Sequence, residues 1–233
     1  MQEKINKRKK YYLMVDTETC NGIVVNDKLD LSNSFVYDIG FAVVDKQGNI
    51  YTTGSYLIVD IFCGEGDLMS SAYYAEKIPN YWKDVKEGKR QVTSFYNARL
   101  IIKNVMEQYN ITTVVAHNAP FDITALNNTQ RWLTKSKYRY FFPFGTEIYC
   151  TLAMARSILP NKKGYLNYCK REGYITQYGK PRMTAEIIYK YLTGNYDFIE
   201  SHTGLEDVLI ESEIFRYCMN QHGKVNKNAY RKK

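Results

Sequence analysis

Three apolar segments rich in β-branched and aromatic residues follow one another near the start of this chain. They cover 11–19, 34–45 and 50–62, and the sequence KQGN at 46–49 separates the last two. Segments of this length and composition predict β-strands, and a short turn between neighbouring strands predicts antiparallel pairing. The first quarter of the sequence therefore predicts an antiparallel meander.

The remaining sequence alternates between helical and strand patterns. A helical pattern at 98–110 is followed by an apolar strand pattern at 111–118 and by another helical pattern at 121–133. Further helices are expected at 151–159, 184–194 and from about 204 to 219, whereas 160–183 is basic and rich in tyrosine and is turn-like at 178–181. A strand between two helices predicts a parallel crossover. We therefore expect a single α/β domain whose mixed sheet, an antiparallel meander plus parallel strands, is flanked by helices.

Composition limits the class of protein. A chain of 233 residues with 45% hydrophobic and 24% charged residues suits one globular domain. No apolar run approaches the length of a membrane span, and the basic N-terminus lacks the apolar core of a secretory signal. The five widely spaced cysteines form no metal-ligand pattern, which favours reduced thiols and a cytoplasmic location.

The positive net charge is concentrated at the two ends of the chain. Residues 1–10 carry five basic side chains and one acidic one, and residues 222–233 carry five basic side chains and no acidic one. Because the whole chain has a net charge of +8, residues 11–221 are close to neutral, at about −1. The two basic tails have two interpretations, solvated ends or contacts with nucleic-acid phosphates.

The first candidate site residues are Asp16 and Glu18, at the end of the first apolar strand. Residues two apart on a strand point to the same face, so these two carboxylates lie side by side. A D-x-E sequence also occurs in surface turns, but the carboxyl end of a central strand is where open α/β sheets bind ligands. Paired carboxylates there suit a divalent cation such as Mg²⁺ or Mn²⁺.

The second element is AHNAPFD at 116–122, where a strand ends and a helix begins. Pro120 suits the first turn of that helix, which places Asp122 in the same turn. Asp122 alone could simply complement the helix dipole. The strand end, however, would bring it close to Asp16 and Glu18.

The third element is HTGLED at 202–207. Thr203 and Glu206 have the spacing of a capping box, with Thr203 as the N-cap. In that frame His202 and Asp207 occupy the two positions that meet in a hydrophobic staple, so imidazole and carboxylate are expected side by side. Glu206 is then a capping residue, and Glu211 and Glu213 are expected to lie outside the site, although Glu211, one turn after Asp207, could approach it.

The three elements resemble, in content and in order, the motifs of the DnaQ-like, or DEDDh, 3′-5′ exonucleases. They read D-x-E at 16–18, N-x-x-F-D at 118–122 and H-x(4)-D at 202–207. The resemblance extends from about Leu13 to Phe215 and includes the helix that begins after Cys150. Many members of that family have Asp where this chain has Cys150. The related subgroup that has Tyr four residues before the last Asp is excluded, because Thr203 stands there.

The resemblance implies an RNase H-like fold and an exonuclease domain over residues 11–221. It also implies that Asp16, Glu18, Asp122 and Asp207 hold two divalent ions, Mg²⁺ or Mn²⁺, and that His202 is the general base. Thr19 would offer its backbone N–H to the terminal 3′-hydroxyl. Such an enzyme removes nucleoside 5′-monophosphates from 3′ ends.

The second motif holds two further candidates for substrate binding. Asn118 could contact the terminal nucleotide or cap the following helix, and Phe121 could stack on a base or fill the core. His117 is expected to be structural. Two stretches that mix aromatic and basic residues, 131–142 and 160–183, suit either contact with a single strand or a solvated helix surface.

Three functions therefore remain open at the level of sequence. A 3′-5′ exodeoxyribonuclease acting on single strands or 3′ ends is favoured. An exoribonuclease with the same site is the first alternative, and a non-catalytic nucleic-acid-binding or polymerase-associated module is the second. Proofreading would require a separate polymerase or replication partner, because no polymerase domain is attached.

Overall fold

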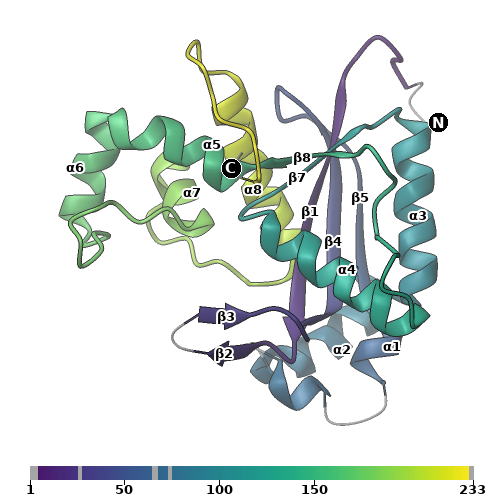
Figure 1. The fold of residues 1–233 in the computed structure, drawn as a ribbon. Coiled ribbons are helices and arrows are strands. Elements are labelled where there is room, and N and C mark those ends of the chain that lie inside the picture. The colour runs from purple at the N-terminus through teal and green to yellow at the C-terminus, as the bar shows by residue number, and fades with distance from the viewer. Residues whose placement is uncertain (1–4, 26–27, 65–67, 73–74, 231–233) are drawn as a thin grey trace.

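A six-stranded mixed sheet lies at the centre of the computed structural model, which describes residues 5–230 except 26–27, 65–67 and 73–74 (Figure 1). Its strand order is β6-β5-β4-β1-β7-β8. The strands are β1 (Tyr11–Cys20), β4 (Phe35–Asp45), β5 (Ile50–Ile58), β6 (Gln91–Thr93), β7 (Thr113–Ala116) and β8 (Glu147–Cys150). A separate hairpin pairs β2 (Ile23–Val25) with β3 (Lys28–Asp30).

The predicted meander is confirmed. β1 pairs antiparallel with β4, which pairs antiparallel with β5. β7 is parallel to β1 and to β8, as the helix-strand-helix order predicts. The sequence patterns did not reveal the hairpin or the short strands β6 and β8. The expected third strand at 50–62 is too long, because helix α1 (Val59–Phe62) takes its last four residues.

Helices cover both faces of the sheet. They are α2 (Ile78–Lys86), α3 (Phe95–Gln108), α4 (Pro120–Thr134), α5 (Thr151–Ile158), α6 (Lys163–Arg171), α7 (Ala185–Thr193) and α8 (Gly204–Met219), with short 3₁₀ turns at Leu68–Ser71, Ala75–Lys77 and Leu159–Asn161. The turn predicted at 178–181 agrees with the structure, where Ile175 and Pro181 form a bridge, but the helix α6 was not predicted. That helix buries the aromatic side chains of Tyr165 and Tyr168, which the sequence patterns had not distinguished from turn residues.

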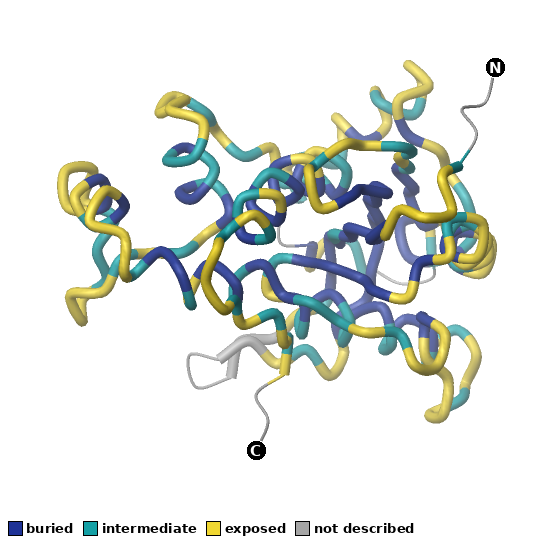
Figure 2. Tube along the Cα trace, turned by 90° about the horizontal axis from the view of Figure 1, so that it is seen from above, coloured by how far each residue is buried: buried dark blue, intermediate teal, exposed yellow. Residues whose placement is uncertain are grey.

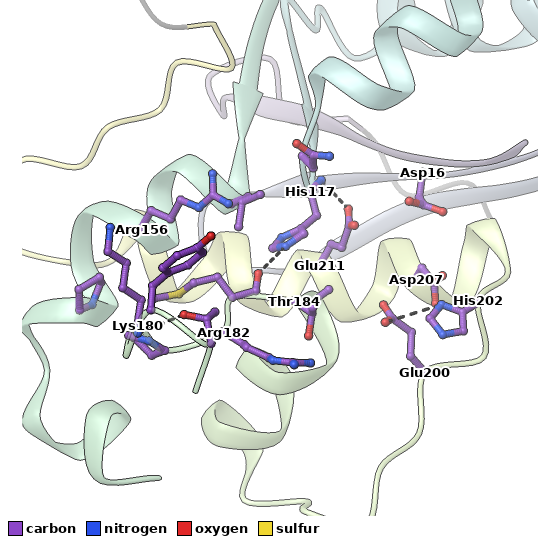
Figure 3. A pocket seen from close by; sticks show the side chains of 18 of the residues that line it. Asp16, His117, Arg156, Lys180, Arg182, Thr184, Glu200, His202, Asp207 and Glu211 are labelled. Atoms are coloured by element: carbon purple, nitrogen blue, oxygen red, sulfur yellow. Dashed lines mark hydrogen bonds and ion pairs between the residues drawn. The ribbon is translucent and has the colours of Figure 1, made fainter. Parts of the chain in front are cut away.

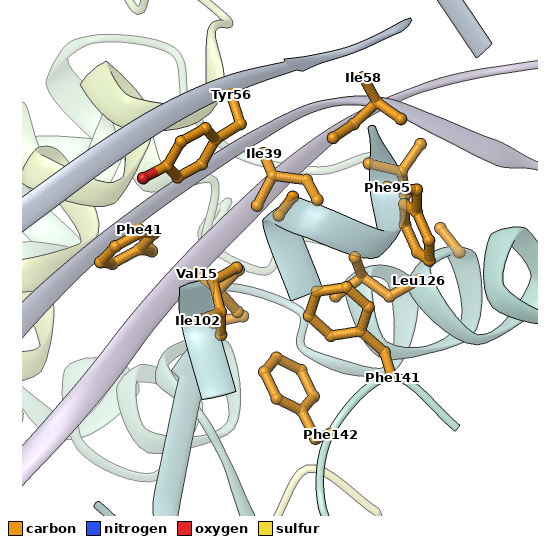
Figure 4. Packing of buried hydrophobic residues seen from close by; sticks show 14 of the residues in the cluster. Val15, Ile39, Phe41, Tyr56, Ile58, Phe95, Ile102, Leu126, Phe141 and Phe142 are labelled. Carbon is orange, nitrogen blue, oxygen red and sulfur yellow. The ribbon is translucent and has the colours of Figure 1, made fainter. Parts of the chain in front are cut away.

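Alternate residues of β1 pack into two different cores. Leu13 and Val15 contact the cluster that includes Ile102 of α3 and Leu126 of α4 (Figure 4). Residues on the other face, such as Met14, belong to the cluster under α5, α6, α7 and α8. Figure 2 shows these buried strands inside the molecule, with exposed segments around them. Since side chains alternate along a strand, Asp16 and Glu18 lie on the α8 side.

Segments at both ends of the chain contact the sheet. Near the start, Lys9 Nζ lies 3.0 Å from Asp45 Oδ2. Near the end, Cys150 N donates to Lys227 O at 3.0 Å, and Asn228 forms a bridge with Tyr149 of β8. The described parts of the two basic tails are therefore partly packed on the domain. No helix in the described ranges has both the length and the apolar character needed to cross a membrane.

Candidate active site

Three of the expected carboxylates converge at the end of β1. Each of Asp16, Glu18 and Asp207 offers a carboxylate oxygen, and these oxygens lie within 4.8 Å of one another. Asp16 and Glu18 come from one face of β1, whereas Asp207 comes from the first turn of α8. The same-face prediction for the D-x-E pair therefore agrees with the structure.

The start of α8 is held directly against the sheet. Thr203 is the N-cap residue, as predicted, and Asp207 N donates to Thr203 O at 3.0 Å. Gly204 N donates to Asp38 Oδ2 of β4 at 3.0 Å. The backbone of Gly204 also lies so close to Gly40 that neither glycine has room for a Cβ. These contacts fix the position from which Asp207 reaches the carboxylates of β1.

The predicted capping box is wrong in its hydrogen bonding. The Thr203 hydroxyl donates to the Glu206 carboxylate and caps no backbone N–H. The carboxylate of Asp38, from a distant part of the sequence, accepts the hydrogen bond from the first helical N–H instead. At most helix starts, a nearby side chain in the sequence accepts a hydrogen bond from such an N–H. Here the carboxylate of Asp38, from the sheet, accepts it instead.

Asp122 lies deeper than the three converging carboxylates. It stands in the first turn of α4, beside Pro120 as predicted, and its side chain is buried. Its Oδ1 accepts hydrogen bonds from Thr17 N at 3.1 Å and from the Thr17 hydroxyl at 2.9 Å. A cavity, described below, opens beside the carboxylates. Asp122 does not line it, but the charge of Asp122 contributes to the raised pKa of Asp16.

His202 lies beside Asp207, as the staple positions predict. One ring nitrogen of His202 lies within 4.8 Å of carboxylate oxygens of Asp207 and Glu200. Its Nδ1 is 3.8 Å from Glu200 Oε2. Burial and the nearby ammonium group of Lys77 lower the pKa of His202, which favours the neutral imidazole near pH 7. The Lys77 ammonium donates to the carbonyl of Ser201, the residue before His202.

Two acidic residues that were not predicted as site residues also line the cavity. Glu211 is buried, and its Oε2 accepts a hydrogen bond from His117 N at 3.1 Å. Its position one helical turn after Asp207 was the signal that could have included it. Glu200 lies in the irregular segment before α8, where no sequence pattern identifies it.

The carboxylates raise one another's pKa. Burial away from solvent is the main cause of the raised pKa of Asp16. The charges of four neighbouring carboxylates raise it further, and these belong to Glu211, Asp122, Glu18 and Asp207. The pKa values of Glu18 and Asp207 are raised by burial in the same way. Asp207 Oδ1 is buried and accepts no hydrogen bond from any described residue. Buried anions with an unsatisfied oxygen fit a divalent cation, which binds oxygen ligands.

Of the remaining predicted site residues, only Asn118 lines the cavity beside the carboxylates. Thr19 is a buried residue of β1. Asn118 is exposed, has a φ of 61° and lines the cavity, but it does not cap α4, whose N-cap is Ala119. Phe121 is partly exposed in the first turn of α4 and belongs to neither core cluster.

His117 has the structural position expected of it. Its Nε2 lies 3.0 Å from Met183 O, and its Nδ1 lies 2.9 Å from the Thr151 hydroxyl. A carbonyl only accepts, so the neutral ring carries its proton on Nε2. His117 therefore joins β7, α5 and the segment before α7.

A cavity of about 1140 Å³ opens beside the carboxylates. Asp16, Asp207, Glu200 and His202 lie at one end, and Arg156, Lys180 and Arg182 lie at the other, with His117 and Glu211 between them (Figure 3). The cavity therefore joins an anionic cluster to a cationic wall.

The fold is that of several solved exonucleases. A full-length 3′-exonuclease superimposes with a TM-score of 0.58 at 13% identity, over 90% of this chain and 81% of that one. The nuclease domain of 3′hExo, a DEDDh family member bound to rAMP, gives 0.56 at 12% identity over 94% and 96%. Exonuclease I of E. coli with a dA13 oligonucleotide gives 0.52 at 12% identity, over 91% of this chain and 40% of that one.

These similarities confirm the RNase H-like fold class. No protein-family model matches the sequence, and no curated protein matches it significantly. At 12–13% identity the shared property is the arrangement of sheet and helices. The fold alone does not define an activity, which depends on the residues of the site itself.

Proposed function

We propose that this protein is a metal-dependent 3′-5′ exonuclease of the DEDDh type. The observation that carries this proposal is the convergence of Asp16, Glu18 and Asp207, whose carboxylate oxygens lie within 4.8 Å of one another. The D-x-E pair on β1 and the first turn of α8, which carries Asp207, meet there. Asp122, which the motif order includes, adds a fourth carboxylate near the same strand end.

Asp16, Glu18, Asp122 and Asp207 would hold two divalent ions, Mg²⁺ or Mn²⁺. When bound, such ions supply positive charge to the phosphodiester and acidify the attacking water. Support for this ligand set comes from the raised pKa of Asp16, Glu18 and Asp207 and from the unsatisfied Oδ1 of Asp207. Glu211 stands near enough to repel Asp16, so it belongs to the same electrostatic cluster.

His202 is the proposed general base. An imidazole whose pKa is lowered remains neutral at pH 7 and can accept the proton of the attacking water. Glu200, 3.8 Å from Nδ1, is placed to orient the ring. Water adds to the phosphorus of the terminal nucleotide, and the bond to the 3′-oxygen of the preceding nucleotide breaks. The products are a nucleoside 5′-monophosphate and a strand with a new 3′-hydroxyl.

The proposed substrate is DNA, as single strands or 3′ ends, with RNA as the alternative. Thr19, Asn118 and Phe121 are proposed to contact the terminal nucleotide, because Thr19 directly follows Glu18 in β1, and Asn118 and Phe121 lie between the end of β7 and Asp122. A non-catalytic module with this fold is a weaker proposal, because the full set of carboxylates and His202 is present.

Three features outside the site complete the proposal. Residues 11–221 would form the exonuclease domain, with basic segments 1–10 and 222–233 at its ends. The five cysteines are all free thiols, which supports a cytoplasmic location. A role in proofreading would need a polymerase or replication protein as a partner.

The test is hydrolysis of 5′-labelled single-stranded DNA and RNA in Mg²⁺ or Mn²⁺. We expect a ladder of products shortened from the 3′ end, and its loss in the Asp16→Ala and His202→Ala variants. Asp197→Ala, which changes an exposed acid, is the matched control. Equal degradation by wild type and Asp16→Ala would refute the site assignment, and the better substrate decides between DNA and RNA.

A further inference from the structure

The cationic end of the cavity is built on a hairpin between α6 and α7. Thr176 N donates to Lys180 O at 2.8 Å, and Arg182 N donates to Tyr174 O at 2.9 Å. The Tyr165 hydroxyl donates to Arg182 O at 2.5 Å. Backbone groups therefore hold the hairpin in place, while the side chains of Lys180 and Arg182 are exposed and line the cavity.

Arg156 of α5 completes this cationic wall from a second element. None of Arg156, Lys180 and Arg182 forms an ion pair with a residue in the described ranges. Nearby basic residues differ, because Arg171 pairs with Glu172 and Lys190 pairs with Glu186. The positive charge of the wall is therefore left for a bound anion.

The position of the cationic wall indicates which anion binds there. The carboxylates at the other end would hold the scissile phosphate, and a 3′-5′ exonuclease has the rest of the strand on the 5′ side of it. The cavity volume of about 1140 Å³ exceeds that of pockets for one drug-sized ligand, about 300–1,000 Å³. The cavity thus has room for more than the terminal nucleotide.

We propose that Arg156, Lys180 and Arg182 bind phosphates on the 5′ side of the scissile bond. This inference rests on the proposed function and narrows its substrate to single strands of at least three nucleotides. A dinucleotide carries only the scissile phosphate, so it leaves the cationic wall without a partner. Such contacts are independent of base sequence, because they involve the backbone alone.

Tyr178 at the tip of the hairpin adds a second kind of contact. Tyr178 is 80% exposed and lines the same cavity. Exposed aromatic rings beside basic side chains hold single strands by stacking on bases. Because stacking releases no counterions, removing Tyr178 weakens binding without changing the dependence on salt.

The test compares two substrates that share the scissile chemistry. One is tetrathymidylate, and the other is the p-nitrophenyl ester of thymidine 5′-monophosphate, which has no upstream phosphate. We expect Lys180→Ala and Arg182→Ala to raise KM for the tetramer about tenfold at low salt, the usual cost of one charge-assisted contact. Hydrolysis of the ester is expected to stay within about twofold of wild type. Lys103→Ala on the far helix α3 is the matched control for loss of one charge.

Binding of 5′-labelled tetrathymidylate at several salt concentrations gives an independent measurement. Each lost phosphate contact should reduce the slope of log affinity against log salt by about 0.7, and Tyr178→Ala should leave the slope unchanged. If Lys180→Ala and Arg182→Ala lose equal activity on both substrates, the proposed role of the cationic wall is overturned. It is also overturned if their slopes of log affinity against log salt are identical to that of Lys103→Ala. If the wild type hydrolyses neither substrate, the proposed function fails, and the binding slopes still decide about the wall.

Discussion

The backbones of Gly40 on β4 and Gly204 at the start of α8 touch without room for a side chain. A Cβ on Gly40 would lie 2.0 Å from the carbonyl carbon of Gly204 and 2.1 Å from Leu205 N. A Cβ on Gly204 would lie 2.6 Å from Gly40 N. This contact sets how closely α8, and with it Asp207, approaches the carboxylates of β1.

The first prediction concerns Gly40→Ala. The new methyl group must push α8 away from the sheet, because backbone atoms cannot yield as a flexible side chain does. We expect a loss of about 1–3 kcal/mol in unfolding free energy and a larger relative loss of exonuclease activity. Thermal unfolding and the labelled-DNA assay measure both effects. Gly223→Ala, where a Cβ meets nothing within 4 Å, is the control, and equal behaviour of the two variants would contradict the prediction.

The second prediction concerns the charge of Asp207. Without metal, burial and, next, the charges of Glu200 and Glu206 disfavour the Asp207 carboxylate, so Asp207→Asn should be more stable than wild type. An increase of a few degrees in Tm is expected, since 1 kcal/mol corresponds to about 2–4 °C at this chain length.

Metal binding should make the wild type more stable than Asp207→Asn. Mn²⁺ at about 100 times its Kd should stabilise the wild type by about 2.7 kcal/mol and leave Asp207→Asn nearly unchanged. Differential scanning fluorimetry with and without EDTA measures both effects. The control is Asp197→Asn, at an exposed position. An equal response to Mn²⁺ in Asp207→Asn and wild type would exclude Asp207 as a ligand.

The third prediction concerns the buried ion pair of Arg90 and Asp38, whose side chains are 2% and 0% exposed. Arg90→Leu leaves the carboxylate of Asp38 buried without its cation, which costs about 3–5 kcal/mol. Adding Asp38→Asn should recover part of that loss, because an amide oxygen can still accept from Gly204 N. Urea unfolding of both variants measures the difference. A double variant no more stable than Arg90→Leu would show that charge burial is not the cause.

The fourth prediction is a pH dependence caused by His117. Burial lowers its pKa from 6.5 to about 4 in the folded protein. Between these values the unfolded chain binds a proton that the folded chain does not, so stability falls as pH decreases from about 6.5 to about 4. The contribution is at most about 3 kcal/mol.

His117→Gln isolates this contribution. The buried carboxylates titrate in both proteins, so the difference in unfolding free energy between wild type and His117→Gln removes their effect. That difference should change by 1 kcal/mol or more between about pH 7 and about pH 4.5. A difference that is constant over this range would rule out His117 as the source.

Several elements were predictable because their signals are local. The turn at 46–49 and the start of a helix at Thr203 have local signals in the sequence, and the structure has both, although the Thr203 side chain caps no backbone N–H. The strands β6 and β8 were not predictable in this way. They have three and four residues, and their pairing with β5 and β7 is what makes them strands. The helix α6 was hidden by its tyrosines, whose burial depends on packing against α7.

The candidate site likewise has features with local sequence signals and features that depend on long-range packing. By itself, the sequence determined that Asp16 and Glu18 share a face and that His202 and Asp207 flank a helix start, because strand alternation and the residue preferences at a helix start act within a few residues. Only the tertiary structure decided that Asp38 caps α8, that Glu200 and Glu211 join the carboxylates, and that Arg182 lies across the same cavity. Those relationships depend on how α8 and the hairpin pack against the sheet, and long-range packing leaves no periodic signal in the sequence.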